Sequence, residues 1–287
     1  MNPYIPTTTN VCAIIITFNP KEGLSKLIQI LSPQFQKVLI VDNGSSVFPP
    51  IENNTALKVR RNKCNLGIAT ALNQGLDDAL ESGYEWAVTF DQDSEPSTEF
   101  LDQMIRSCMQ IKAAEFLLGA NYYHAHRGQI AHLSPSQSVN PFNRTTLITS
   151  GMLLRLEFAL AIGGFQDSYF IDSVDHEFCL RASQHGAKIL ITSTPLMQHH
   201  IGVHRAGKRW TLALSSSHEP VRKYYIARNT LWTVRTYIWK NPAWCVRQIA
   251  RLAAEFAGII FFESHRMAKV SAFVRGLKDG LRRHGIK

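Results

Sequence analysis

The sequence predicts an α/β fold in which helices flank a mostly parallel central sheet and a C-terminal helical region follows. Three observations support this prediction. Short apolar, β-branched runs alternate with segments of helical spacing, polar residues follow the ends of several of these runs, and the pattern becomes helical from about Glu219. The 287 residues, 45% of them hydrophobic, suffice for one packed domain with a helical appendage and exclude a disordered chain.

The parallel sheet follows from the order of the elements. The first run, 11–17, is apolar and β-branched and ends at Asn19 and Pro20, which is typical of a buried parallel strand followed by a loop. A strand, a helix and a second strand then indicate a right-handed parallel unit. We predict strands at 11–17, 37–41, 57–60, 84–90 and 116–123, helices at 22–31, 66–82, 96–112 and 175–185, and a polar loop or hairpin at 128–144.

Charge divides the chain into two parts. Residues 1–204 hold 14 Lys and Arg against 18 Asp and Glu, whereas residues 205–287 hold 17 against 4. We therefore predict an N-terminal domain over 1–204 and a basic amphipathic helical region over 205–287. The excess of positive charge in 205–287 indicates either an anionic partner or a packed subdomain whose arginines are solvated.

The basic region is expected to lie on a membrane at most, and not to cross it. Its longest uncharged apolar piece, 256–262, is far shorter than the roughly 20 residues of a spanning helix. Its apolar face is predicted from helical spacing, with Arg247 and Arg251 on another face. The residues of that apolar face are Cys245, Ile249, Leu252, Phe256 and Ile259.

The cysteines and the first residues favour a cytoplasmic protein. The five cysteines are scattered and form no C-x-x-C pair, as expected for reduced thiols and not for a disulfide or zinc framework. Residues 1–10 are polar and contain no positive cluster that leads into an apolar stretch, so we expect no secretory signal. Neither a dinucleotide fingerprint nor a P-loop is present around Gly67.

Polar side chains at three predicted strand ends indicate a ligand site. Asn19, Asp42 and the pair Asp91 and Asp93 would share the carboxyl edge of one sheet, where open α/β sheets bind ligands. Two carboxylates one residue apart in an extended segment point the same way and can hold a hard cation such as Mg²⁺ or Mn²⁺. A solvated loop carries the same triplet, so this alternative stays open.

A second group of residues suits proton transfer. Asp175 is expected in the first turn of a helix, where the helix dipole favours its ionised form and prepares it to accept a proton. Helix capping is the alternative reading. Glu177 could instead pair with Arg181, four residues on.

Two further clusters could contact a phosphate or a sugar. His200 lies in a histidine cluster that could border a metal or phosphate, although a structural role explains it as well. Tyr225 and Arg228 lie within one helical turn of each other, and phenol and guanidinium groups suit a phosphate or carbohydrate. A packed amphipathic helix would look the same.

Together these residues resemble the inverting family 2 glycosyltransferases with the GT-A fold, and most closely their bacterial rhamnosyltransferases. The resemblance runs from about Val11 to Asn229 and depends on the order of its motifs. Its motifs are Ile16–Asn19, Val41–Ser45, the stretch Asn65, Leu66, Gly67, Ala71, Leu72 and Asn73, the D-x-D of Asp91 and Asp93, Ser150–Met152, Phe170–Asp175, and Tyr224, Tyr225, Arg228 and Asn229. Val174 departs from the pattern, because the family often has glutamate at that place before the catalytic aspartate.

The resemblance implies a role for each of these sites. It implies a general base at Asp175 and a divalent metal, Mg²⁺ or Mn²⁺, held with Asp93 and His200. Donor-nucleotide contacts are implied for Thr17, Phe18, Asn19, Asp42, Asn65, Gly67 and Asp91. Contacts to the sugar, the acceptor or the diphosphate are implied for Gly151, Met152, Asp172, Glu177, Tyr225 and Arg228.

The implied function is transfer of L-rhamnose from dTDP-β-L-rhamnose to a saccharide acceptor in O-antigen or capsule synthesis. The acceptor would be carried on a polyprenyl diphosphate, and the enzyme would be cytoplasmic and peripheral on an anionic membrane, with no nucleic-acid partner. A UDP- or GDP-sugar donor is the alternative within the family. Outside it, a haloacid dehalogenase-like phosphatase and a basic membrane or nucleic-acid adaptor remain, although Ser94 and Glu95 depart from the phosphatase pattern after Asp93.

Overall fold

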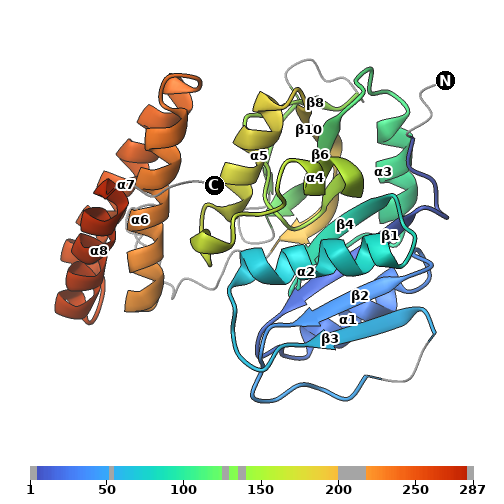
Figure 1. Cartoon of the computed structure of the whole chain (residues 1–287), viewed down its shortest axis with the longest axis horizontal. Helices are drawn as coiled ribbons and strands as arrows, with labels where there is room; N and C mark the ends of the chain where they lie inside the picture. Colours follow the sequence, from blue (N-terminus) through green and yellow to red (C-terminus); the bar gives the residue numbers. More distant parts are fainter. Residues whose placement is uncertain (1–4, 52–54, 125–128, 135–139, 200–217, 283–287) are drawn as a thin grey trace. The chain divides into compact units, whose positions relative to one another are not determined.

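The computed structural model describes residues 5–51, 55–124, 129–134, 140–199 and 218–282 (Figure 1). The chain divides into two compact units. Unit 1 comprises Met1–Asp167 and Phe178–Ile201, and unit 2 comprises Ser168–Glu177 and Gly202–Lys287. The predicted domain boundary at 204/205 falls in 200–217, outside the described residues, and stays a prediction.

Unit 1 contains one mixed sheet with the strand order β3-β2-β1-β4-β9-β6-β10-β5. The pairs β1–β2, β2–β3, β1–β4 and β6–β10 are parallel, and β9 lies antiparallel between β4 and β6. The predicted α/β fold class is confirmed. The strands are β1 (Val11–Thr17), β2 (Val38–Asp42), β3 (Leu57–Arg61), β4 (Trp86–Asp91), β5 (Glu95–Pro96), β6 (Phe116–His124), β7 (Gln129–Ile130), β8 (Phe142–Asn143), β9 (Met152–Arg155) and β10 (Lys188–His199).

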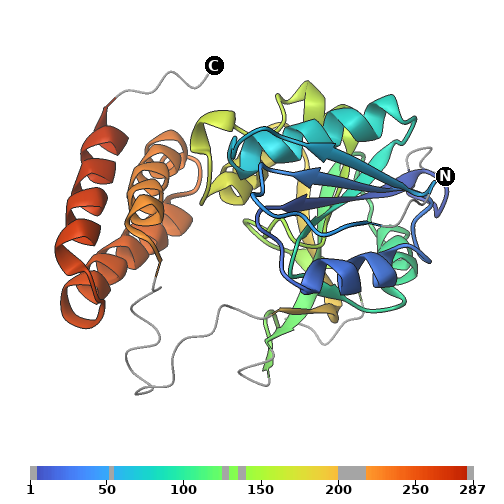
Figure 2. The same ribbon diagram turned by 90° about the horizontal axis from the view of Figure 1, so that it is seen from below.

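Helices cover both faces of this sheet, which explains the continuous apolar runs. Every residue of β1 is buried, as expected for a parallel strand between two helical layers. Ile15 packs into the core with α1 (Gly23–Leu31) and α3 (Phe100–Cys108), whereas Ile14 contacts Gly75 of α2 (Ile68–Glu81) on the other face. Figure 2 shows α1 and α2 on opposite sides of the strands.

Two predicted elements of unit 1 differ from the structure. The helix expected over 96–112 is shorter, because Glu95 and Pro96 form β5, which pairs with β10 and delays the start of α3 to Phe100. Within the segment expected as a loop or hairpin, the described residues include β7 and β8, which pair with β6 and β10. The short helix α4 (Leu156–Ala161) follows β9.

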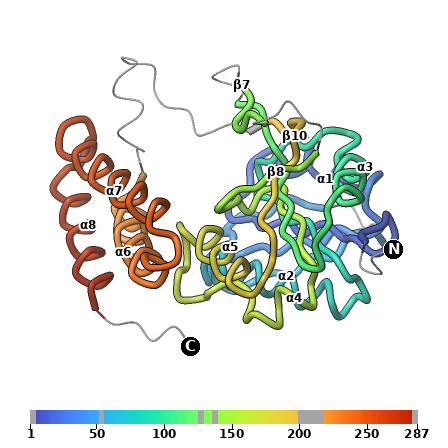
Figure 3. The backbone as a smooth tube through the Cα atoms, turned by 90° about the horizontal axis from the view of Figure 1, so that it is seen from above, coloured from blue at the N-terminus to red at the C-terminus, as the bar shows by residue number. Residues whose placement is uncertain are grey.

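Unit 2 contains three helices that lie side by side, α6 (Pro220–Tyr237), α7 (Pro242–Phe262) and α8 (Arg266–Leu281) (Figure 3). The boundary between the units passes through α5 (Val174–Gln184), and the short 3-10 helix η1 (Asp167–Tyr169) lies at the preceding boundary. Among the described helices, none combines the length and the apolar character needed to cross a membrane.

The buried face of α7 differs in part from the predicted one. Cys245, Leu252 and Ile259 are buried as predicted, but Ile249 is 41% exposed and Gln248 is buried in its place. Because α7 carries apolar residues around most of its circumference, its packing against α6 and α8 selects the buried face, and the spacing of apolar residues alone does not.

Candidate active site

Loops at the carboxyl ends of β1, β2 and β4 are joined by hydrogen bonds. The backbone N–H of Phe18 donates to Gln92 Oε1 at 2.8 Å, and that of Asn19 donates to Ser45 Oγ at 2.7 Å. Asn19 Oδ1 accepts from the Ser46 N–H at 3.0 Å. The structure therefore brings together the three strand ends at which the sequence predicted a ligand site.

Asp42 ends β2 and is fully buried at the centre of these loops. Its carboxylate accepts from Thr17 Oγ1 at 3.3 Å, from Arg61 Nε at 3.1 Å, and from both the N–H and the hydroxyl of Ser45. Arg61 lies opposite Asp42 in the parallel register of β2 and β3. In this arrangement Asp42 holds three loops together and places a guanidinium beside the site.

The loop before α2 is fixed to the β2 end by Asn43. Asn43 Nδ2 donates to Asn65 Oδ1 at 3.0 Å and to the Gly67 carbonyl at 3.1 Å. Gly67 precedes α2 with φ 89°, and Gly44 has φ 83°. A Cβ on Gly44 would overlap the backbone of Cys64, so the close approach of the two loops requires glycine there.

The two carboxylates at the end of β4 have different surroundings. Asp91 is partly buried, and its Oδ1 accepts from Thr149 Oγ1 at 3.4 Å. Asp93 is exposed and makes no hydrogen bond or ion pair with another described residue. Of the two, Asp93 is therefore the carboxylate that is open to a ligand.

Gly151 and Met152 lie beneath this surface. Gly151 has φ 76°, and a Cβ on it would overlap Met197 and approach the Ala120 Cβ to 2.9 Å. Met152 is 0% exposed and pairs with Thr89 in the sheet. Both residues pack inside unit 1, and the Met152 side chain does not reach the surface.

In unit 2, the segment before α5 has an unusual backbone. Phe170, Asp172 and Ser173 have φ values of 62°, 65° and 60°, a left-handed conformation that costs free energy for residues other than glycine. Asn229 holds this segment, because its buried Nδ2 donates to the carbonyls of Ile171 and Asp172 at 2.7 and 2.9 Å. Such a conformation persists only where its surroundings enforce it.

Asp172 and Asp175 are presented by this strained segment. Burial raises the pKa of Asp172, while the guanidinium of Arg222, which contacts both carboxylate oxygens at 3.1 Å, acts in the opposite direction. The Asp175 side chain is 22% exposed and lies in the first turn of α5, where its Oδ1 accepts from the His176 N–H at 2.8 Å. Asp175 therefore lies in the first turn of a helix, as the sequence predicted, and its side chain also has access to solvent.

The other predicted residues of unit 2 are held by internal contacts. Tyr225 stacks on Phe170 with ring centres 5.0 Å apart, and the Arg228 guanidinium lies 4.7 Å from the Tyr225 ring. Arg228 also donates to the Ser168 carbonyl at 2.6 Å. Glu177 is 0% exposed, and its Oε1 accepts from the Tyr237 hydroxyl at 3.0 Å.

Comparisons with known proteins identify the family. The model of the family described as glycosyl transferase family 2 matches residues 12–151. Over 295 residues the chain is 30% identical to a protein named dTDP-rhamnosyl transferase RfbF from Shigella flexneri, with 96% of each chain covered. The chain belongs to glycosyltransferase family 2. The predicted family, its resemblance to bacterial rhamnosyltransferases and the predicted enzyme class are confirmed.

Solved structures confirm the GT-A fold of this family 2 glycosyltransferase. A crystal structure of GalNAc-T7 with UDP, GalNAc and Mn²⁺ has a TM-score of 0.58 at 13% identity and covers 76% of this chain and 47% of its own. S. aureus TarS 1–349 in complex with UDP-GlcNAc has a TM-score of 0.57 at 14% identity and covers 95% of this chain and 80% of its own. At these identities the similarity concerns the fold alone.

The carboxylates of this glycosyltransferase suit a metal ion that is shared with a substrate. Within the described part of the chain, no group of three or more His, Cys, Asp and Glu side chains could hold a metal ion. Mg²⁺ is commonly held by one or two carboxylates, and phosphates and water complete its shell. Asp91 and Asp93 fit that kind of site, whereas the predicted ligand His200 lies outside the described residues.

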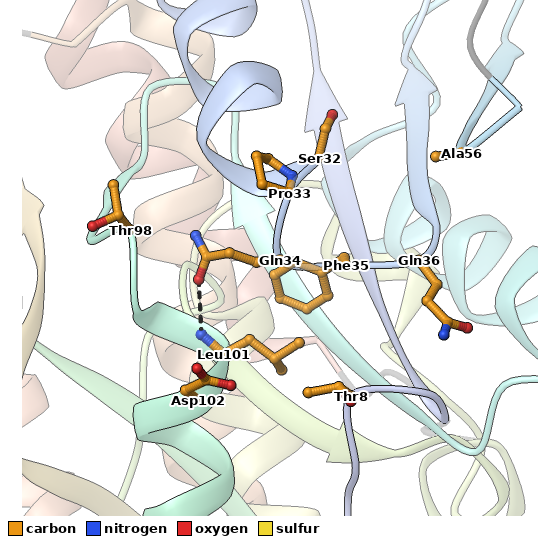
Figure 4. Close-up of a pocket in the computed structure, with 10 residues that line it drawn as sticks. All are labelled: Thr8, Ser32, Pro33, Gln34, Phe35, Gln36, Ala56, Thr98, Leu101 and Asp102. Carbon is orange, nitrogen blue, oxygen red and sulfur yellow. Dashed lines mark hydrogen bonds between the residues drawn. The ribbon is translucent and has the colours of Figure 1, made fainter.

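In this family 2 enzyme, a cavity of about 570 Å³ lies at the amino-terminal ends of the parallel strands. Figure 4 shows it between the segments that precede the strands, where Thr8 comes before β1 and Ala56 before β3. Gln34 Oε1 accepts from the Leu101 N–H at 3.1 Å on its wall. This amino-terminal edge is opposite the predicted ligand site, so the cavity takes no part in it.

Sequence reasoning missed two polar residues of this glycosyltransferase. Arg61 lies beside Asp42, and Gln92 binds the Phe18 backbone between the two aspartates of the D-x-D. The only available signal for either residue was its polar side chain within or next to a motif at the end of a predicted strand. Gln92 lies 74 residues from its partner Phe18, and Arg61 lies 19 residues from its partner Asp42. Local sequence patterns do not show such pairings.

Proposed function

We propose that this glycosyltransferase transfers L-rhamnose from dTDP-β-L-rhamnose, with inversion, to a saccharide acceptor in the assembly of an O-antigen or capsule. The supporting observation is the 30% identity to a protein named dTDP-rhamnosyl transferase, which extends over 96% of both chains. A match of that length covers both units and not the donor-binding fold alone.

In the proposed donor site, the loops at the carboxyl edge of unit 1 bind the nucleotide and the diphosphate. Asp42 positions Thr17 and Arg61 at the nucleotide end, and Asn65 and Gly67 border it. Asp93, with Asp91 beside it, would hold Mg²⁺ or Mn²⁺. That ion supplies positive charge against the diphosphate.

In the proposed reaction, Asp175 takes the proton of the acceptor hydroxyl. The hydroxyl oxygen forms a bond to the anomeric carbon while the bond from that carbon to the diphosphate oxygen breaks, and the diphosphate leaves with the electron pair. Because the attack comes from the face opposite the leaving group, the configuration inverts. Asp175 lies in the first turn of α5, at the positive end of the helix dipole.

Donor preference and metal dependence test this proposal. Binding and slow hydrolysis are compared for dTDP-rhamnose, UDP-glucose, UDP-galactose and GDP-mannose, with Mn²⁺ or Mg²⁺ and with chelator. We expect a metal-dependent preference for dTDP-rhamnose. Preference for another nucleotide sugar would overturn the rhamnosyl assignment, and equal activity in chelator would overturn the metal.

Two substitutions separate the proposed roles. Asp93→Asn should lower turnover by about 10²- to 10³-fold, the effect of losing one group that stabilises developing charge. Asp102→Asn, an exposed aspartate on α3, is the matched control and should leave turnover unchanged. Asp175→Asn should retain donor binding but lose transfer, and full transfer by this variant would exclude Asp175 as the base.

We also propose that unit 2 attaches the cytoplasmic enzyme to an anionic membrane that carries the polyprenyl-diphosphate-linked acceptor. The outward face of α7 supports this, because Val246, Ile249 and Phe261 are 63%, 41% and 68% exposed at helical spacing. Arg247 and Arg251 are exposed on the adjoining face. Apolar residues flanked by basic ones suit an anionic lipid surface, where each basic residue contributes roughly 1 kcal/mol.

Vesicle binding tests the attachment. The protein should sediment with vesicles that contain phosphatidylglycerol, less with pure phosphatidylcholine vesicles, and less at high salt. Val246→Ser combined with Phe261→Ser should weaken binding, whereas Val59→Ser, an exposed valine of unit 1, should not. Absence of vesicle binding at low salt would overturn the attachment.

A further inference from the structure

A small polar cavity lies within unit 2, beside the start of α5. Its volume is about 200 Å³, and its walls come from the start of α5, from α6 and from α7. Pockets that hold drug-sized ligands measure about 300 to 1,000 Å³. The cavity therefore has room for a single small ring and not for a nucleotide.

The carboxylates on its wall are already neutralised. Asp172 pairs with Arg222 at 3.1 Å, and Glu255 pairs with Lys223 at 2.5 Å. A cation would have to displace these basic partners and would also meet Arg251, which lines the cavity, whereas an anion would meet the two carboxylates. A wall that carries both signs of charge suits an uncharged polar ligand.

Other polar side chains on the wall make no hydrogen bond to another described residue. The side chains of Ser173, Thr230 and Gln248 hydrogen-bond no other described residue, and His176 Nδ1 is buried without a hydrogen bond. Gln248 is 9% exposed as a whole residue. Hydroxyls, an amide and an imidazole offer both donors and acceptors, which match the hydroxyl groups of a sugar.

Residues on either side of the proposed base line the cavity, although Asp175 itself does not. Ser173 and His176 line it on either side of Asp175 in the sequence, and Asp175 Oδ1 lies 3.6 Å from His176 Nδ1. We propose that this cavity holds one sugar ring of the acceptor, so that the acceptor subsite is built from unit 2 alone. The assignment rests on the proposed function and adds the residues that would select the acceptor, namely Ser173, His176, Thr230 and Gln248.

The test uses methyl glycosides of rhamnose, glucose, galactose and N-acetylglucosamine as probes. Their binding to the full chain is followed by saturation-transfer NMR, and their ability to accelerate nucleotide release from the donor is measured in parallel. At least one glycoside should bind and accelerate release. Inorganic phosphate should not displace it, and displacement by phosphate would identify an anion site and overturn the proposal.

Gln248→Leu and Thr230→Val remove the polar groups at nearly constant volume. Each should raise the KM for the glycoside about tenfold relative to the KM for the donor, which corresponds to about 1.4 kcal/mol. Ser271→Ala, an exposed position on α8, is the control and should change neither constant. Thermal unfolding shows whether each variant folds. If Gln248→Leu does not fold, Thr230→Val still tests the proposal.

Two outcomes would overturn the subsite. One is equal glycoside binding by the wild-type protein and both variants. The other is that the wild-type protein hydrolyses the donor, but no glycoside binds to it or accelerates the hydrolysis. Absence of donor hydrolysis with every nucleotide sugar would instead contradict the proposed function, so the two failures are distinguishable.

Discussion

At the residue scale, a few backbone positions shape the carboxyl edge of unit 1. The loop after β2 and the loop before α2 meet at Gly44, where a Cβ would overlap the Cys64 backbone. Asn43 links the same loops through its side-chain amide. The proposed donor site therefore depends on a steric requirement at one glycine as well as on charged side chains.

Gly44→Ala should destabilise the protein more than Gly83→Ala. Both glycines have nearly the same φ, 83° and 84°, but a Cβ on Gly83 meets nothing within 4 Å. The left-handed conformation alone costs about 1 to 2 kcal/mol for alanine, and Gly44→Ala adds displacement of the neighbouring loop. Urea unfolding and donor titration measure the two effects, and equal losses would show that the loop contact is unimportant.

At the element scale, an ion cluster fastens α2 to the edge strand β3. Asp78 of α2 is 2% exposed and contacts Arg60 Nε at 2.7 Å and Lys58 Nζ at 2.8 Å. The hydrogen bond from Arg60 is the largest cause that lowers the pKa of Asp78. Alternate residues of β3 thus project basic groups toward one helix.

Asp78→Asn should lower the free energy of unfolding by about 2 kcal/mol at pH 7, as expected for a hydrogen bond to a charged group. Because folding lowers the pKa of Asp78, its contribution is complete above the unfolded value of 3.8 and is lost as pH falls through the lower folded value. The stability difference between wild type and variant should therefore shrink in strong acid. Asp77→Asn, its exposed neighbour, is the control, and a difference independent of pH would contradict the ion cluster.

At the scale of the whole molecule, each unit has its own stabilising interior. The interior of unit 2 includes a buried charge network that joins its three helices. Glu263 contacts Lys223 of α6 at 2.6 Å and Lys269 of α8 at 2.7 Å, and Lys223 is 0% exposed. Breaking such a network leaves a buried charge without compensation.

Glu263→Gln should destabilise unit 2 by about 3 to 5 kcal/mol, the range for removing one partner of a buried ion pair. Hydrogen exchange followed by mass spectrometry should show faster exchange in peptides of α6, α7 and α8, with unit 1 little changed. Glu219→Gln, an exposed carboxylate of the same unit, should have no such effect. Equal acceleration in both units would show that they unfold together.

The sequence by itself determined most elements of unit 1 and the location of its proposed donor site. Runs such as β1 and β2 are apolar up to a polar last residue and are followed by turn residues, and both signals are local. The location of the aspartates at the ends of β2 and β4 could be predicted once the ends of these strands were recognised. In a parallel sheet, the position of a strand end fixes the edge at which its last residue lies.

Only the tertiary structure decided how several polar residues are held. Glu177 hydrogen-bonds Tyr237 and Arg228 hydrogen-bonds the Ser168 carbonyl, each 60 residues away, and the substrate contacts predicted for both stay predictions. The start of α3 and the buried face of α7 were likewise set by partners distant in the chain. Periodicity and turn chemistry depend on neighbouring residues, whereas burial and pairing depend on contacts between segments that meet only on folding.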